Sequence, residues 1–392
     1  MNRIKDIAAD SKIQLALSGL AERETELLDL IISVQQIPAP TFDEADRAAF
    51  VEKYLSNLGL QDVQQDRIHN VYARFRGTNS ELSTPLIVSA HSDTVFPIET
   101  DLSITRNGHL LCGPGIGDNA TGVAGIMTLA KTLRTLDLVP KSDIWFIVNV
   151  GEEGLGNLRG MRAVVEKFGR QARYIVVEGG SYGQIIHEAI GVRRFRIVIT
   201  TKGGHSWGSF GQPSAIHEIG HLIVDISRLS VPISPKTTYN IGVIEGGTTV
   251  NSIASSASFL LDLRSEETAV LEELVSQVKA IVESRRAKSK QEDRDVAFHL
   301  EQVGNRPAGQ TPHEDPLVFL AEKALHQVGW PHVMNIAGST DANIPLSQNI
   351  PCVCVGLTTS GNSHRLDEYI DLTHLQAGMQ QLILLALAAA DY

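Results

Sequence analysis

The chain has 392 residues, of which 43% are hydrophobic and 20% charged, so it is too apolar for an intrinsically disordered protein. At roughly 100–200 residues per domain, this length allows two or three domains. The 34 basic and 45 acidic side chains give a formal charge of −11 without a long Lys or Arg run, so neither nucleic acid nor a membrane surface is expected as a partner.

The sequence predicts no targeting or membrane-spanning segment. The N-terminus lacks the apolar run of roughly 7–15 residues of a secretory signal. The most apolar stretch, residues 382–390, is shorter than the roughly 20 residues of a membrane span and is interpreted as a buried C-terminal helix. Three cysteines are too few for a disulfide framework, so a reduced, cytoplasmic protein is expected.

The first part of the chain is typical of an α/β fold. Helices are predicted at 22–34, 41–58, 121–136 and 158–168. Short, almost wholly apolar runs occur at 86–90, 144–150 and 174–177, and again at 352–357. Such runs favour parallel strands that are covered by helices on both faces.

A different pattern interrupts this alternation from 192 to 303. The predicted elements there are a strand at 194–200, a helix at 214–229, strands at 237–244 and 256–264, a helix at 266–286 and a strand at 296–303. The order β-α-β-β-α-β is that of a ferredoxin-like domain. After it the α/β pattern resumes with helices at 316–328 and from 372. We therefore predict a discontinuous α/β domain, 1–191 and 304–392, with an inserted domain at 192–303.

His91 and Asp93 directly follow the first apolar run. Residues two apart on an extended chain point to the same side, so these two side chains can act together. A metal-bound imidazole commonly has its other nitrogen held by a carboxylate. A buried His–Asp hydrogen bond would produce the same pair.

Ligand-type residues also follow the other predicted strands and the glycine-rich loop. They are Asp118, Glu152, Glu153, Glu178 and His364. In open α/β sheets the carboxyl ends of the strands share one crevice, so these side chains are expected to converge there. Four carboxylates would repel one another unless cations neutralised them. The sequence therefore predicts a metal site.

A set of nitrogen and oxygen donors without a thiolate suits zinc, with cobalt or manganese possible. Five ligands, His91, Asp118, Glu153, Glu178 and His364, are too many for one tetrahedral ion but suit two ions that share a carboxylate. Glu152 then stays unligated and can serve as general base to a water activated by the two zinc ions.

Several motifs resemble a known family, the dinuclear zinc exopeptidases and deacylases. This family includes peptidase T, glutamate carboxypeptidase, acetylornithine deacetylase, succinyl-diaminopimelate desuccinylase and aminoacylase. The matching motifs, in chain order, are His91-Ser92-Asp93, Gly117-Asp118-Asn119, Glu152-Glu153-Gly154, Glu178-Gly179, Gly203-Gly204-His205-Ser206 and Ser363-His364. The resemblance extends from about residue 86 to residue 370.

The resemblance implies a role for each matching residue. It places His91 and Glu178 on one metal, Glu153 and His364 on the other, and Asp118 between them. It implies that Glu152 is the base and that Asp93 orients His91. The fold implied is a zinc-exopeptidase-like α/β catalytic domain with an inserted lid and dimerisation domain, and hence a homodimer.

Substrate contacts are implied in the same way. His205 matches a histidine that reaches a neighbouring active site and stabilises the oxyanion, although a turn histidine among glycines would look the same. Asn251 matches a position that holds a polar group of the substrate. Arg264 is a candidate for the substrate carboxylate, which a guanidinium suits, but Asp262 makes a structural ion pair an equal alternative for Arg264. Gly338 and Ser339 lie in a turn whose backbone N–H groups can receive a carboxylate.

The expected activity is hydrolysis of amide bonds in small peptides. The alternative is an N-acyl-amino-acid deacylase, and the two hints on this choice disagree. Glu at position 178 is typical of the deacetylase and aminoacylase branches, whereas 339–343 look closer to tripeptidase-like members.

Three other interpretations fit the sequence less well. Residues 217–221 fit H-E-x-x-H, a zinc motif, but they lie in the inserted domain without a familiar third ligand. Gly113, Gly115 and Gly117 suggest a nucleotide site, but their spacing is not the dinucleotide fingerprint. A non-catalytic metal-binding protein is disfavoured because the base and all five ligands are present.

Overall fold

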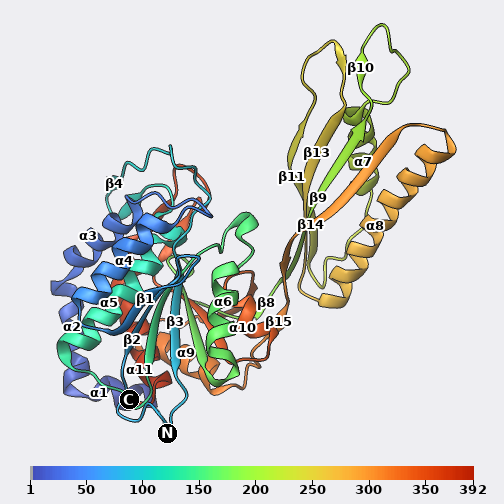
Figure 1. The fold of residues 1–392 in the computed structure, drawn as a ribbon. Coiled ribbons are helices and arrows are strands. Elements are labelled where there is room, and N and C mark those ends of the chain that lie inside the picture. Colours follow the sequence, from blue (N-terminus) through green and yellow to red (C-terminus); the bar gives the residue numbers. More distant parts are fainter. Residues whose placement is uncertain (1–2) are drawn as a thin grey trace. The chain divides into compact units, whose positions relative to one another are not determined.

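The computed structural model describes residues 3–392, which divide into two units. The first unit comprises 3–189 and Gly309–Tyr392, and the second comprises Ile190–Ala308. Figure 1 shows a sheet covered by helices in the first unit and a separate sheet with two helices in the second.

A nine-stranded mixed sheet forms the centre of the first unit. Its order is β1-β2-β6-β3-β7-β17-β8-β15, with β16 beside β8. The strands are β1 (Gln61–Gln65), β2 (Val71–Phe75), β3 (Leu86–His91), β6 (Ile144–Asn149), β7 (Arg173–Glu178), β8 (Gln184–Ala189), β15 (Gly309–Gln310), β16 (Met334–Gly338) and β17 (Cys352–Gly356). The four predicted apolar runs are β3, β6, β7 and β17, and they are parallel neighbours at the centre of the sheet.

Helices cover both faces of this sheet. One face packs against α1 (Arg3–Ala9), α2 (Ser11–Glu22), α3 (Glu24–Gln35), α4 (Ala45–Asn57), α5 (Thr121–Leu136), α9 (Pro316–Gln327) and α11 (Leu375–Ala389). The other face packs against α6 (Arg159–Phe168) and α10 (Asn343–Ser347). Within the described chain, Leu372–Ala389 has the length and composition of a membrane span, but 67% of this stretch is buried, as in a core helix.

The helix predicted from residue 41 begins only at Ala45, so the predicted start was wrong. Phe42 has a φ of 81°, in the left-handed region, and therefore cannot belong to a right-handed helix. The Glu44 carboxylate accepts a hydrogen bond from the Phe42 N–H and another from Arg159. The segment before α4 is thus a fixed loop.

A small sheet, β18-β19-β5-β4, joins two segments that are far apart in sequence. Its strands are β4 (Thr105–Asn107), β5 (Leu110–Cys112), β18 (Thr359–Gly361) and β19 (Tyr369–Asp371). The loop after β5 and the β18–β19 hairpin meet because β5 pairs with β19. Short helical turns at Ile116–Ala120, Gly154–Gly156, Gly169–Gln171 and Leu372–His374 complete the unit.

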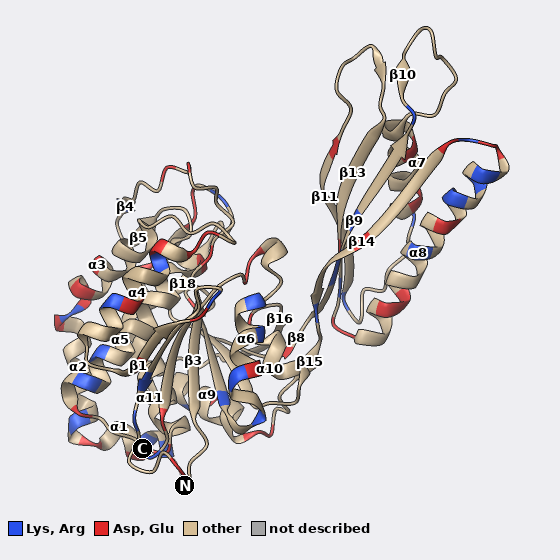
Figure 2. Ribbon diagram, viewed as in Figure 1, with Lys and Arg blue, Asp and Glu red and all other residues tan. Residues whose placement is uncertain are grey.

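The second unit has the chain order β-α-β-β-α-β and is ferredoxin-like, as predicted. Its elements are β9 (Gly191–Thr201), α7 (Ala215–Ile226), β11 (Thr237–Gly246), β13 (Ser256–Ser265), α8 (Thr268–Gln291) and β14 (Val296–Arg306). The antiparallel sheet has the order β11-β13-β9-β14, and α7 and α8 pack on it around one apolar core. A short ladder pairs β10 (Gly204–His205) with β12 (Ser252–Ile253). In Figure 2, basic and acidic residues intersperse along α8, whereas β3 carries neither.

Candidate active site

The predicted ligands of the first unit gather at the carboxyl ends of its central strands. His91 is the last residue of β3, and Glu178 is the last residue of β7. Glu153 lies in the loop that follows β6. Asp118 comes from the loop between β5 and α5, and His364 comes from the β18–β19 hairpin.

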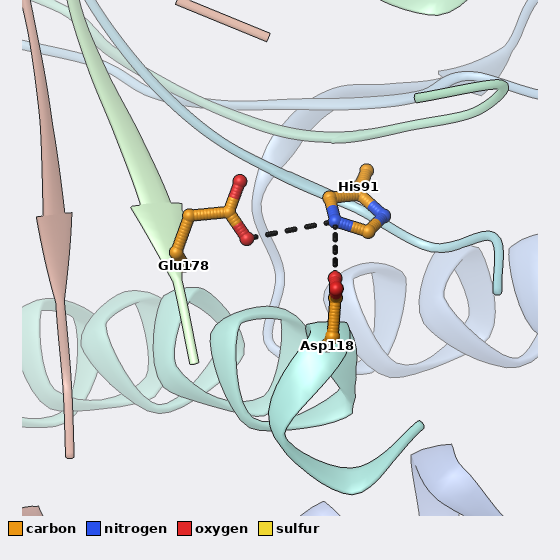
Figure 3. Close-up of side chains that lie close together, drawn as sticks. All are labelled: His91, Asp118 and Glu178. Atoms are coloured by element: carbon orange, nitrogen blue, oxygen red, sulfur yellow. Dashed lines mark ion pairs between the residues drawn. The ribbon is translucent and has the colours of Figure 1, made fainter. Parts of the chain in front are cut away.

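The first group of ligands consists of His91, Asp118 and Glu178 (Figure 3). The Nε2 atom of His91 lies 3.1 Å from Asp118 Oδ1 and 3.5 Å from Glu178 Oε2. His91 is only 1% exposed, so its imidazole is held in one place by the surrounding strands.

The second group consists of Asp118, Glu153 and His364. The Nε2 atom of His364 lies 3.2 Å from Asp118 Oδ2 and 3.0 Å from Glu153 Oε1. Asp118 therefore belongs to both groups and directs one carboxylate oxygen to each. In each group, the possible donor atoms lie within 4.8 Å of one another. This set of carboxylates and imidazoles fits two divalent cations that share one carboxylate.

The charges in these groups shift several pKa values. Burial raises the pKa of Glu153 to about 7, even though the hydrogen bond with His364 opposes the shift. Hydrogen bonds with Asp118 and Glu153 raise the pKa of His364 to about 10. Burial opposes a charge on His91, but Glu178 and Asp118 together raise its pKa well above the ordinary value. These shifts reflect an excess of negative charge, which bound cations would neutralise.

Glu152 lies beside the two ligand groups but belongs to neither. Glu152 is buried, with 6% of the residue exposed. Burial is the largest cause of the raised pKa values of Glu153 and Glu178, and the charges of Asp118 and then Glu152 raise them further.

Asp93 has more partners than the expected contact with His91. Its carboxylate accepts hydrogen bonds of 2.9 Å from the backbone N–H groups of Glu152 and Glu153 and from the Thr41 hydroxyl. His91 Nδ1 lies 3.1 Å from the backbone oxygen of Asp93 and 3.6 Å from its Oδ1. Asp93 therefore fixes the β6 loop as well as the imidazole.

Three buried residues support the site in ways that the sequence did not indicate, although two of them, Asn119 and Asp341, lie in segments that match the family. Asn119 accepts hydrogen bonds from the N–H groups of Gly122 and Gly179, which ties the Asp118 loop to the end of β7. Asp341 accepts a 2.6 Å hydrogen bond from Asn149, the last residue of β6. Glu368 accepts hydrogen bonds from the loop that carries Asp118. Their partners could not be identified from local spacing.

Gly338 and Ser339 also belong to the first unit. Gly338 ends β16, and Ser339 follows it on the way to Asp341. Burial and the charge of Glu152 raise the pKa of Asp341 well above its ordinary value, so this turn lies within electrostatic range of the predicted base.

His205 and Asn251 lie side by side in the second unit. The Ser206 N–H donates to the Asn251 backbone oxygen, and His205 pairs with Ser252 in the β10–β12 ladder. His205 Nδ1 accepts hydrogen bonds from the N–H groups of Trp207 and Gly208. The proton of a neutral His205 must therefore reside on Nε2, which can donate.

Two other predicted features of the second unit have structural partners. Arg264 donates to Asp262 at 2.7 Å, and Arg194 donates to the other oxygen of the same carboxylate at 2.8 Å. In the H-E-x-x-H segment, Glu218 is buried and pairs with Arg294. This ion pair gives Glu218 a structural role.

The fold and the two ligand groups define a class of protein, α/β enzymes with a two-ion centre of carboxylates and imidazoles. The family model "Peptidase family M20/M25/M40" matches residues 87–388. The chain belongs to this family, so the enzyme class expected from the sequence, an amide-bond hydrolase, is confirmed.

Similar proteins include both peptidases and deacylases. The uncharacterized protein YqjE of Bacillus subtilis is 26% identical over 84% of this chain and 89% of its own length. An N-formyl-4-amino-5-aminomethyl-2-methylpyrimidine deformylase of Halalkalibacterium halodurans is 24% identical over 93% of this chain and 94% of its own length. The crystal structure of a tripeptidase from Staphylococcus aureus superposes with a TM-score of 0.76 at 20% identity, covering 94% of this chain and 99% of that one.

Proposed function

We propose that this protein is a two-zinc exopeptidase that cleaves small peptides with a free terminus. The observation that carries the proposal is the position of Asp118, whose two oxygens each face a histidine of a different ligand group. Zinc is the proposed metal because the donors are nitrogen and oxygen atoms, and cobalt or manganese could replace it. When bound, such ions supply Lewis acidity toward a water and a carbonyl oxygen.

Glu152 is the proposed general base. Its carboxylate would take a proton from the attacking water and later give it to the nitrogen of the departing amine. Asp93 supports this role because its carboxylate accepts a hydrogen bond from the backbone N–H of Glu152. This bond fixes the backbone position from which the Glu152 side chain extends. Asp93 is also the proposed positioning residue for the imidazole of His91.

His205 is proposed to donate its Nε2–H to the oxyanion that forms when water adds to the amide carbonyl. Two backbone N–H groups donate hydrogen bonds to Nδ1, so the proton of the neutral ring resides on Nε2. This supports the assignment of Nε2 as the donor. We propose that the second unit acts as a lid and as the contact between the two chains of a dimer; its bounds from the sequence are 192–303. His205 would then donate its hydrogen bond in the active site of the partner subunit.

Four further residues are proposed to bind the substrate. Asn251 would hold a polar group of the substrate, and Arg264 would hold its carboxylate by exchanging part of its contact with Asp262. Gly338 and Ser339 would present backbone N–H groups to a second carboxylate or carbonyl. The side chain of Arg264 is 43% exposed, so a ligand could approach it.

An N-acyl-amino-acid deacylase is the second candidate. Glu178 supports this candidate, because a glutamate at this ligand position is typical of the deacetylase branch. The similarity to a deformylase over nearly the whole chain supports it as well. The proposed location is the cytoplasm, because all three cysteines are free.

An activity screen would decide between these candidates. The zinc-loaded protein would be given matched di- and tripeptides and N-acetyl amino acids, each with and without a chelator. Chelator-sensitive cleavage of peptides alone supports the exopeptidase, and preference for N-acyl substrates supports the deacylase. Chelator-insensitive activity would contradict both.

A further inference from the structure

One buried carboxylate holds the loop that carries Asp118. Glu368 Oε1 accepts hydrogen bonds from the N–H groups of Gly117 at 2.7 Å and Asp118 at 2.8 Å, and Oε2 accepts one from Gly115 at 3.2 Å. The backbone oxygen of Glu368 accepts a fourth bond, from Gly113 at 2.8 Å. Glu368 is 0% exposed, so these contacts are shielded from water.

The fold places Glu368 there through the small sheet. Tyr369 pairs with Cys112 in the β19–β5 ladder, so the chain that leaves β5 passes directly beside Glu368. The hairpin that ends at Glu368 also carries His364, whose imidazole faces the Asp118 carboxylate. One hairpin therefore contacts Asp118 twice, at its carboxylate through His364 and at its backbone through Glu368.

Two glycines of this loop lie where a side chain would be strained or crowded. Gly115 has a φ of 70°, a conformation that favours glycine. A Cβ atom at Gly117 would lie 3.2 Å from Glu368 Oε1 and 2.9 Å from the Cβ of Ser360. Successive backbone N–H groups that converge on one point form an anion-binding concavity. In this chain, the concavity is filled by Glu368, which accounts for a glycine-rich loop without a nucleotide.

We propose that Glu368 is a positioning residue for Asp118 and thereby sets the affinity of the protein for both metal ions. The inference rests on the proposed two-ion function. Asp118 can direct one oxygen to each ligand group only if its backbone is fixed, and its N–H is held by Glu368. Because Asp118 belongs to both groups, loosening this loop weakens both.

Glu368→Gln is the most direct variant. Glutamine keeps the size of the side chain, but its NH₂ group cannot accept a hydrogen bond, so at least one of the three N–H groups loses its acceptor. Asp367→Asn is the matched control, because Asp367 lies in the same hairpin and pairs with Arg365 on the exposed surface. The readouts are the Zn²⁺ dissociation constant by chelator competition, the visible absorption spectrum of the Co²⁺-loaded protein, and thermal unfolding without metal.

The proposal predicts that Glu368→Gln raises the Zn²⁺ dissociation constant by about 10- to 100-fold and changes the Co²⁺ spectrum, whereas Asp367→Asn matches the wild type. A lower unfolding temperature with unchanged affinity and spectrum would overturn it, because a merely structural residue would behave in this way. If Glu368→Gln does not fold, Glu368→Asp applies the same test, since it keeps the charge but shortens the reach. A wild-type protein that binds no metal would instead overturn the proposed function.

Discussion

The Oδ2 atom of Asp93 accepts a hydrogen bond of 2.9 Å from the backbone N–H of Glu153. The other carboxylate oxygen accepts an equal bond from the N–H of Glu152. One buried side chain thus fixes two adjacent acidic residues for which we propose different roles, one as metal ligand and one as base. This arrangement connects the end of β3 to the loop after β6.

Replacing Asp93 by Asn is therefore expected to affect both roles. The amide NH₂ cannot accept, so one N–H of the β6 loop is left buried and unpaired, at a cost of about 1–3 kcal/mol in the free energy of unfolding. We expect metal affinity to fall by about 10- to 100-fold. Chelator competition measures the affinity, and Thr41→Val, which removes one bond to the same carboxylate, should have a smaller effect. Wild-type affinity in Asp93→Asn would refute this assignment.

His205→Ala is expected to lower kcat by about 10²- to 10³-fold with little change in KM, since the proposed hydrogen bond forms to the oxyanion. A mixing experiment tests whether the residue acts across a dimer. After subunit exchange, Glu152→Gln and His205→Ala should together recover about a quarter of wild-type activity, because half the dimers then contain one intact site. No recovery despite demonstrated exchange would exclude action in the partner subunit.

The H-E-x-x-H segment is expected to contribute nothing to metal binding. His217 and His221 are exposed on α7, while Glu218 pairs with Arg294. The double variant His217→Ala, His221→Ala should retain the full metal content by elemental analysis. Glu218→Gln should lower the free energy of unfolding by about 1–3 kcal/mol without losing metal, because it weakens a buried contact. Loss of an ion from the histidine variant would instead reveal a metal site in α7.

Asp262 gives the second unit a pH-dependent contribution to stability. Burial alone would raise its pKa, but the hydrogen bonds and charges of Arg264 and Arg194 lower the pKa below its ordinary value. Such a carboxylate stabilises the folded state above its unfolded pKa of about 3.9, and this stability is lost as pH falls through the folded pKa.

Asp262→Asn should therefore lower the free energy of unfolding by about 1 kcal/mol between pH 5 and 8. The difference from the wild type should shrink below pH 4. Urea unfolding followed by circular dichroism at several pH values provides the measurement. A difference that grew as the pH was lowered would have the wrong sign for this ion pair.

The sequence was informative where apolar runs are continuous. The four central strands are buried on both faces, so each can be recognised as a continuous apolar run. The residues that follow their carboxyl ends could therefore be grouped into one site. β1 was missed because its sequence, QDVQQ, is polar at an exposed edge of the sheet. The predicted start of α4 was wrong because the Thr41 hydroxyl donates a hydrogen bond to Asp93 instead of beginning the helix.

The supporting residues of the site could not be predicted for a different reason. Asp341 pairs with Asn149 across 192 positions of the chain. Glu368 and Asn119 bind backbone N–H groups, which every residue except proline offers, so no side-chain pattern reveals what they hold. Such contacts depend on the register of strands, which a single sequence does not reveal.

Metal content and turnover of Glu152→Gln, measured on the same sample, show whether the base and the metal ligands are separate residues. We expect two ions per chain, as in the wild type, and a fall in kcat of about 10²- to 10⁴-fold, because only the base is removed. Glu153→Gln should differ by losing metal. Turnover at the wild-type rate, or fewer than two ions in Glu152→Gln, would contradict the separation of ligand and base at this pair of residues.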